Sequence, residues 1–186
     1  MNGTGVLFYD NFATFPSTNW VTNGVPVQDL TIGNPPPSAH ISQLGGSIGQ
    51  MTLVPTVNTN GGATVSFDVK LTPGQNGRAY ALIQGTSTYN QGLAFVNDNG
   101  QIEFDIVIAG ADYTATIPFN VDANFHNFAF KVDPSGNAEW IRDGNPEMEQ
   151  SGFPTNIIMN LKLTGDYPFE GSVGDVWVDN VEITSP

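Results

Sequence analysis

Two acidic side chains in one short segment are the part of this sequence that could do chemistry. Residues 102–108 alternate so that Glu103 and Asp105 share one face of a strand, while apolar residues share the other. A retaining glycosidase needs two carboxyl groups about 5 Å apart, one as nucleophile and the other as acid. The second group would stand at position 107 on a regular strand, or at 108 after a bulge, and these positions hold Val107 and Ile108. The segment therefore contains part of such a site and lacks its proton donor.

Strands must position these side chains, and alternating apolar segments occur along most of the sequence. The clearest alternating residues are Val65, Phe67, Val69 and Leu71; Phe128, Phe130 and Val132; and Ile157, Met159, Leu161 and Leu163. Turn-forming clusters separate such segments, at 60–62, 75–77, 97–100, 133–137 and 143–146. We therefore expect an all-β fold, a two-sheet antiparallel β-sandwich of the jelly-roll type. It is expected to form a single domain over residues 1–186, with an extended proline-rich loop at 34–37.

The charge of the chain argues against several classes of partner. A net charge of −13 with only five Lys and Arg residues disfavours nucleic acid and anionic lipid, because both require cations that pair with phosphate. No apolar run approaches the roughly 18 residues of a membrane span, so we expect no membrane insertion. The chain has no cysteine, which excludes disulfides and thiolate chemistry. The acidic excess could attract divalent cations.

The composition is typical of β proteins found outside the cell or on virus particles. Charged residues make up only 12%, with 21 Gly and 13 Pro, so neutral polar residues must cover the surface. The sequence opens on Met1 without the basic and apolar regions of a secretory signal. We expect an extracellular or virion-surface location. It would be reached by export with a signal that was removed or lies upstream, or by release on lysis as for phage structural proteins.

Several short motifs occur in a characteristic order. They are Tyr9-Asp10-Asn11-Phe12 with Trp20, then Phe125-His126-Asn127-Phe128, Ala138-Glu139-Trp140-Ile141-Arg142-Asp143-Gly144, Ile157-Ile158-Met159-Asn160-Leu161 and Val178-Asp179-Asn180-Val181-Glu182-Ile183. In this order the sequence resembles family 16 glycoside hydrolases, which include laminarinases and lichenases. More broadly, it resembles the concanavalin A-like lectin/glucanase superfamily. The resemblance implies a jelly roll with a concave face that holds glycan in the active relatives.

The resemblance also gives the acidic segment an expected role. Family enzymes carry Glu-x-Asp-x-(x)-Glu as nucleophile, assisting carboxylate and acid/base, and Glu103 and Asp105 match the first two positions. Val107 or Ile108 stands at the third. Because loss of a general acid costs about 10²–10⁴ in rate, the resemblance implies a scaffold without this hydrolase activity. The alternatives for Glu103 and Asp105 are two polar residues on a solvent-facing strand, glycan contacts, or residual catalysis.

A structural Ca²⁺ site is a further implication of the resemblance. The family places a calcium ligand in its last strand, where Asp179 stands, with backbone carbonyls completing the site. Asp10 is the expected neighbour, and Gly45 is a candidate carbonyl donor. The alternative is a strand-end Asp179 that accepts backbone N–H groups.

Polar and aromatic residues could form a glycan-binding groove. The candidates are Trp20, Tyr89, Asn97, Glu103, Asp105 and Tyr167, with Asp68 and Asn160 nearby. Aromatic rings offer a large rigid surface for a sugar ring. For Trp140 and Trp177 we expect core packing instead.

These observations predict a non-catalytic, lectin-like module that binds glycan or recognises a surface. One alternative is a structural virion protein, such as a capsid decoration or tail-associated protein, that packs against other virion proteins. A weaker alternative is a divergent glycoside hydrolase whose acid has moved to a loop, with Glu147, Glu149 and Glu170 as candidates. His40 and His126 lack a second ligand at zinc-binding spacing, so we expect no zinc site.

Overall fold

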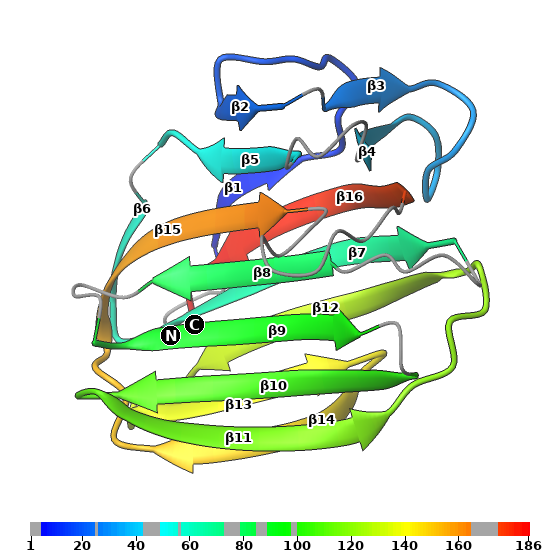
Figure 1. Ribbon diagram of the computed structural model, residues 1–186. Helices are drawn as coiled ribbons and strands as arrows, with labels where there is room; N and C mark the ends of the chain where they lie inside the picture. Colours follow the sequence, from blue (N-terminus) through cyan, green and yellow to red (C-terminus); the bar gives the residue numbers. More distant parts are fainter. Residues whose placement is uncertain are drawn as a thin grey trace.

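The computed structural model describes residues 5–24, 26–42, 49–55, 57–72, 79–84, 89–97, 100–164 and 175–186. Every regular element in these ranges is a strand, and the strands form two antiparallel sheets. Figure 1 shows the two sheets stacked face to face. The expected all-β sandwich is confirmed. No helix in the described ranges has the length and apolarity needed to cross a membrane.

The first sheet, named here the β7 sheet, contains the last strand of the chain near its centre. Its strands run in the order β14 (Asn145–Ser151), β13 (Asn137–Arg142), β12 (Phe125–Val132), β7 (Ala63–Leu71), β16 (Asp175–Thr184), β4 (Ser38–Ser42) and β3 (Val27–Asp29). The strand β1 (Val6–Asp10) also pairs with β16, which brings the two ends of the chain side by side (Figure 1).

The second sheet, named here the β10 sheet, carries the acidic segment. Its strands run in the order β11 (Ala111–Pro118), β10 (Gln101–Ile108), β9 (Gln91–Asn97), β8 (Ala79–Gln84), β15 (Asn156–Thr164), β5 (Gln50–Leu53) and β2 (Trp20–Asn23). The strand β6 (Val57–Asn60) also pairs with β15. In Figure 1 this sheet lies in front, and its outer face is turned toward the viewer.

Apolar residues from both sheets fill the space between them. The alternating residues Val65, Phe67, Val69 and Leu71 of β7 are all buried, and so are Ile102, Phe104 and Ile106 of β10. Trp140 of β13 is fully buried and packs against Phe104 with ring centroids 5.4 Å apart. Its indole N–H donates to the backbone carbonyl of Asp105 over 3.1 Å, which ties the two sheets together.

The hairpin between β10 and β11 turns through two residues. Ala109 and Gly110 both have positive φ, 49° and 84°, as a tight two-residue hairpin of the primed type requires. The turn fixes the register of the two strands and so decides which residues of β11 lie beside the acidic segment.

A long connection between β3 and β4 covers part of the outer face of the β7 sheet. Residues 30–37 form no regular element, as the proline run predicted. Asn34 is the anchor of this loop, because its backbone N–H donates to Asp179 over 2.6 Å.

Candidate functional site

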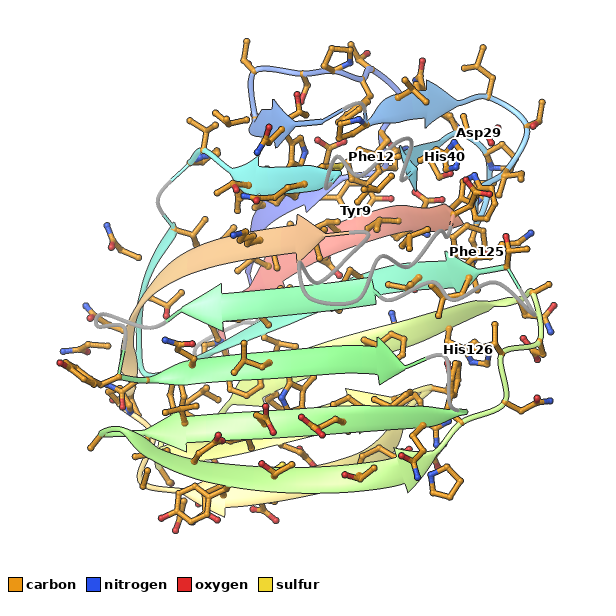
Figure 2. All side chains as sticks on the ribbon, in the orientation of Figure 1. Tyr9, Phe12, Asp29, His40, Phe125 and His126 are labelled. Carbon is orange, nitrogen blue, oxygen red and sulfur yellow. The ribbon has the colours of Figure 1, made fainter. Side chains whose placement is uncertain are left out.

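The alternation of β10 divides its side chains between the core and the outer face of the sheet. Since Ile102, Phe104 and Ile106 belong to the core, Glu103, Asp105 and Val107 lie on the outer face. The register places Thr116 opposite Glu103, Thr114 opposite Asp105 and Asp112 opposite Val107. These six residues, Glu103, Asp105, Val107, Asp112, Thr114 and Thr116, are called here the β10–β11 patch. Figure 2 shows oxygen-bearing side chains along these two strands.

Asp105 is buried although it lies on the outer face. Its exposed fraction is only 6%, and its Oδ1 has no hydrogen-bond partner within the described part of the chain. The expectation that both acidic residues face solvent is therefore corrected for Asp105 and holds for Glu103, which is exposed. Asp105 is flanked across the strands by Leu93 and Thr114, at the distance where side chains contact each other.

This burial changes the acidity of Asp105. Burial raises the pKa of its carboxyl to about 6, the hydrogen bond with Thr114 opposes the rise, and the charges of Asp112 and Glu103 add to it. A group with this pKa holds a proton in mildly acidic solution. The Asp105 carboxyl can therefore change between its neutral and its charged form in mildly acidic solution.

Tyr89 lies at one end of the patch. Its carbonyl accepts the N–H of Gly110 over 3.1 Å, which places it beside the β10–β11 turn, and its side chain is 66% exposed. Glu103 lies toward the other end, four residues from Val107 and so about 13 Å along the strand. The structure thus brings Glu103 and Asp105 to one face of the β10 sheet and places Tyr89 beside the turn at the end of that hairpin.

Other expected glycan contacts are placed differently. Asn97 ends β9 opposite Gln101, and nothing further is described of its side chain. Tyr167 lies outside the described residues. Asp68 lies on the outer face of the other sheet, where it accepts hydrogen bonds from the side chains of Asn34, Asn127 and Asn180.

Trp20 does not form a sugar-stacking surface. Only 5% of it is exposed, and its ring packs against Phe8 and Phe12 with centroids 6.1 and 5.8 Å away. Its indole N–H donates to Asp10 over 2.9 Å. The expectation is corrected because the N-terminal segment encloses the ring in the core.

Trp140 and Trp177 are both buried, as predicted for packing residues. Trp177 stacks on His40 with centroids 4.7 Å apart and donates to Asp29 over 3.0 Å. His40 and Asp29 lie near each other at the β3–β4 side of the molecule (Figure 2).

The two carboxylates expected to bind calcium, Asp179 and Asp10, both accept N–H groups. Asp179 is fully buried, and its two oxygens accept the backbone N–H groups of Asn180 (2.8 Å) and Asn34 (2.6 Å). Burial raises the pKa of Asp179 above its usual value, while these hydrogen bonds oppose the rise and the charges of Asp68 and Asp10 add to it.

The second expected ligand, Asp10, accepts the N–H of Phe12 over 2.7 Å as well as the indole of Trp20. No three acidic or histidine side chains of the described ranges are placed to share one metal ion. Gly45 lies outside the described residues. The expected site relies on backbone carbonyls beside Asp179, so it is not tested by these contacts and stays a prediction.

The candidate acids for a relocated catalytic group lie on a strand, where a loop was expected. Glu147 and Glu149 belong to β14, the edge strand of the other sheet. Glu147 accepts the Nε–H of Arg142 over 2.7 Å, so its carboxylate is already paired. Glu170 lies outside the described residues.

Two further groups were not among the site residues expected from the sequence. Asp112 follows the Ala109-Gly110 turn, and only the hairpin register brings it next to Asp105. His126, labelled in Figure 2, lies between two carboxylates: its Nδ1 is 2.8 Å from Asp143 and its Nε2 is 3.1 Å from Asp122. Acidic residues next to turns are the signal that could have indicated both groups.

Comparisons with known proteins agree on the fold. No protein-family model matches the sequence, and no curated protein matches it. The catalytic domain of an endo-1,3-beta-glucanase (laminarinase) from Thermotoga petrophila RKU-1 superposes with a TM-score of 0.69 at 14% identity, over 98% of both chains. A structure from work on the endo-acting O-glycanases of the human gut microbiota gives a TM-score of 0.73 at 15% identity, over 98% of this chain and 100% of that one.

A carbohydrate-binding module and a neurotoxin structure share the fold too. The carbohydrate-binding module CBM66 from Bacillus subtilis gives a TM-score of 0.59 at 14% identity, over 89% of this chain and 95% of that one. The chain also matches a botulinum neurotoxin type C structure, with a TM-score of 0.61 at 10% identity, and spans 42% of its length. At these identities the similarity establishes the fold alone. The concanavalin A-like, glucanase-like fold that the sequence predicted is confirmed.

Proposed function

We propose that this chain is a non-catalytic, lectin-like module that binds glycan through the outer face of the β10 sheet, outside the cell or on a virion surface. The observation that carries the proposal is the β10–β11 patch, in which exposed Glu103, Thr114 and Thr116 stand in register and an exposed Tyr89 lies at one end. Carboxylates and hydroxyls can hydrogen-bond sugar hydroxyls, and a tyrosine ring can stack on a sugar ring. The similar fold of a carbohydrate-binding module supports this function.

The side chain at position 107 supports a binding role over hydrolysis. Val107 cannot donate a proton, and Asp105, which holds one in mildly acidic solution, is buried beneath the surface. We expect no release of reducing ends when the protein is incubated with a β-1,3-glucan. Turnover that disappears in Glu103→Gln would instead establish the hydrolase alternative.

A glycan array followed by calorimetry tests the binding proposal. We expect Tyr89→Ala and Glu103→Gln each to weaken binding of a captured glycan by roughly tenfold. Tyr9→Ala is the matched control, because Tyr9 is 52% exposed but lies on β1 of the other sheet. The proposal is wrong if no glycan is captured, or if the two patch variants bind as well as the control.

A second candidate function is packing against other virion or surface proteins. Large apolar side chains are exposed near the ends of both sheets: Val21 (62%), Leu30 (70%) and Val54 (51%). They lie on or next to β2, β3 and β5, which come together at the top of Figure 1. Exposed apolar groups of this kind favour association with a partner. Binding to a capsid shell that is lost in Val21→Ser with Leu30→Ser, without glycan affinity, would support this function.

A structural Ca²⁺ at Asp179, with Asp10 and Gly45, is a separate proposal. If it binds, a chelator should lower the melting temperature, because a ligand specific to the folded state stabilises it. An unchanged melting temperature with chelator and with added calcium would reject the site.

A further inference from the structure

Among the described residues, no nearby cation balances the negative charge of the β10–β11 patch. Glu103, Asp105 and Asp112 lie within one hairpin, and the cation of the described residues on this outer face is Lys162 of β15. Lys162 is in line with Asp105 through Leu82 and Leu93, three strands away. At about 4.8 Å per strand the separation is about 14 Å, which exceeds the Debye length of about 8 Å in physiological salt.

The other described cations belong to the β7 sheet and have partners there. Lys131 pairs with Glu139 over 3.7 Å, and Arg142 pairs with Glu147 over 2.6 Å. Lys70 lies over the ring of Trp177, 5.6 Å from its centroid. Within the described ranges, the charge of the patch is therefore open to a cation from outside the chain.

The buried oxygen of Asp105 is an independent observation that indicates a ligand. More than nine-tenths of Asp105 is buried, and its Oδ1 lacks a partner among the described residues. A buried carboxylate oxygen without a partner is costly, and a positive charge bound nearby would offset that cost. The acidic groups of the described ranges do not converge on one point that would hold a metal ion. This arrangement favours a ligand whose positive charges are spread along its length.

We infer that the β10–β11 patch recognises a glycan with free amino groups, such as an oligosaccharide of glucosamine that lacks N-acetyl groups. The inference rests on the proposed function and names its substrate class. The ammonium groups would pair with the exposed carboxylates of Glu103 and Asp112, while hydroxyls of the sugar bond to Thr114 and Thr116. Sulfated and other acidic glycans are disfavoured by the patch and by the net charge of −13.

Binding of such a ligand should be coupled to the ionisation of Asp105. An ammonium group above the patch favours the charged carboxylate, so the affinity of the wild type relative to Asp105→Asn should rise as the pH increases from about 5 to about 7. Loss of protons from the amino groups of the sugar affects both proteins alike and cancels in this ratio. The titratable groups that face Asp105 are Glu103 on its own strand and Asp112 on β11, and their charges act against its ionisation. On β9 the cross-strand neighbour of Asp105 is Leu93, which does not titrate.

Calorimetry with four hexamers on the full chain tests the inference. The probes are a fully de-N-acetylated glucosamine hexasaccharide, its N-acetylated form, a β-1,3-glucose hexasaccharide and hexalysine. We expect the de-N-acetylated sugar to bind at least roughly tenfold more tightly than the two neutral sugars, and more tightly than hexalysine. Glu103→Gln and Asp112→Asn should each remove most of that preference, whereas Glu182→Gln on the other sheet should keep it. The ratio of wild-type affinity to Asp105→Asn affinity should increase between about pH 5 and about pH 7, and a constant ratio would contradict the coupling to Asp105.

The outcomes separate this inference from the proposed function. Equal affinity for the de-N-acetylated and N-acetylated sugars overturns the inference and leaves glycan binding intact. Binding of hexalysine alone indicates a basic-peptide site and overturns both. A failure of all four probes to bind overturns the inference. Thermal melting of each variant checks that lost binding is not lost folding.

Discussion

Two buried aspartates, one in each sheet, show how the surroundings of a carboxyl group determine its role. Asp179 in β16 and Asp105 in β10 both lie on the outer face of their sheet, and burial raises the pKa of each. Asp179 is covered by the loop that carries Asn34, and both of its oxygens accept backbone N–H groups. The Oδ1 of Asp105 lacks any such donor in the described part of the chain. Asp179 holds the loop against the sheet, and the Oδ1 of Asp105 is left for a ligand.

Removal of the covered carboxylate should have the largest effect. In Asp179→Ala the part-buried N–H groups of Asn34 and Asn180 lose their acceptor, and a hydrogen bond to a charged group contributes about 1.5–3 kcal/mol. We expect the free energy of unfolding at neutral pH to fall by about 2–5 kcal/mol in urea denaturation. A loss below about 1 kcal/mol would contradict the structural role given to Asp179.

Removal of the charge of Asp105 should stabilise the protein at neutral pH, in contrast to the loss of Asp179. The pKa of Asp105 is about 6 in the folded chain, against a usual value of 3.8, so the folded state holds more protons between these values. The contribution of Asp105 to stability is therefore highest below the usual pKa and is lost as the pH rises to about 6. Asp105→Asn should exceed the wild type in stability above about pH 6, by on the order of 1–3 kcal/mol.

Urea denaturation of both proteins at about pH 4 and about pH 7 measures this difference. The two proteins should be similar at the lower pH and should separate at the higher one. An Asp105→Asn variant that is less stable than the wild type at neutral pH would show that a partner satisfies the ionised carboxylate.

The sequence predicted the sheets better than it predicted these two environments. Alternation in segments such as 63–71 and 101–108 depends only on nearest neighbours along the chain, so the core faces of β7 and β10 could be predicted. Burial of Asp105 depends on two neighbouring strands, and the hydrogen bonds of Asp179 depend on a loop more than a hundred residues earlier. Such contacts follow from the register and from loop docking, which the local pattern does not contain.

The burial of Trp20 could not be predicted from the local sequence pattern either. A tryptophan among polar residues near the start of the chain was compatible with a sugar platform. Its burial results from packing on Phe8 and Phe12 and from the hydrogen bond to Asp10. These partners lie within twelve residues of Trp20, but they come from β1 and from the irregular connection to β2, where no alternating pattern predicts the packing.

Asp29 is a more accessible aspartate, and its pKa is shifted in the opposite direction. The pKa of Asp29 is lowered to about 2, because hydrogen bonds from Thr31, Trp177 and Ile32 together outweigh the opposing effect of burial, which is the largest single cause. Its stabilising effect is present above the usual pKa of 3.8 and is lost as the pH falls toward about 2. Asp29→Ala removes hydrogen bonds worth about 1 kcal/mol each and should lower the melting temperature at neutral pH by a few degrees. The deficit should shrink at about pH 2; a deficit that is the same at both pH values would show that packing, not the charge, stabilises this turn.

The smallest expected effect comes from Thr114, which supplies the hydrogen bond that favours the charged form of Asp105. Thr114→Val keeps the shape of an exposed β11 side chain and removes the hydroxyl, so stability should change by less than about 1 kcal/mol. The pKa of Asp105 should nevertheless rise above about 6, because only the opposing effect is lost. Titration of the Asp105 carboxyl carbon by NMR measures this shift, with Thr116→Val as the matched control on the same strand. If the midpoint stays in place in Thr114→Val, burial and the neighbouring acids alone set the acidity of Asp105, and the hydroxyl of Thr114 is free to bond a ligand.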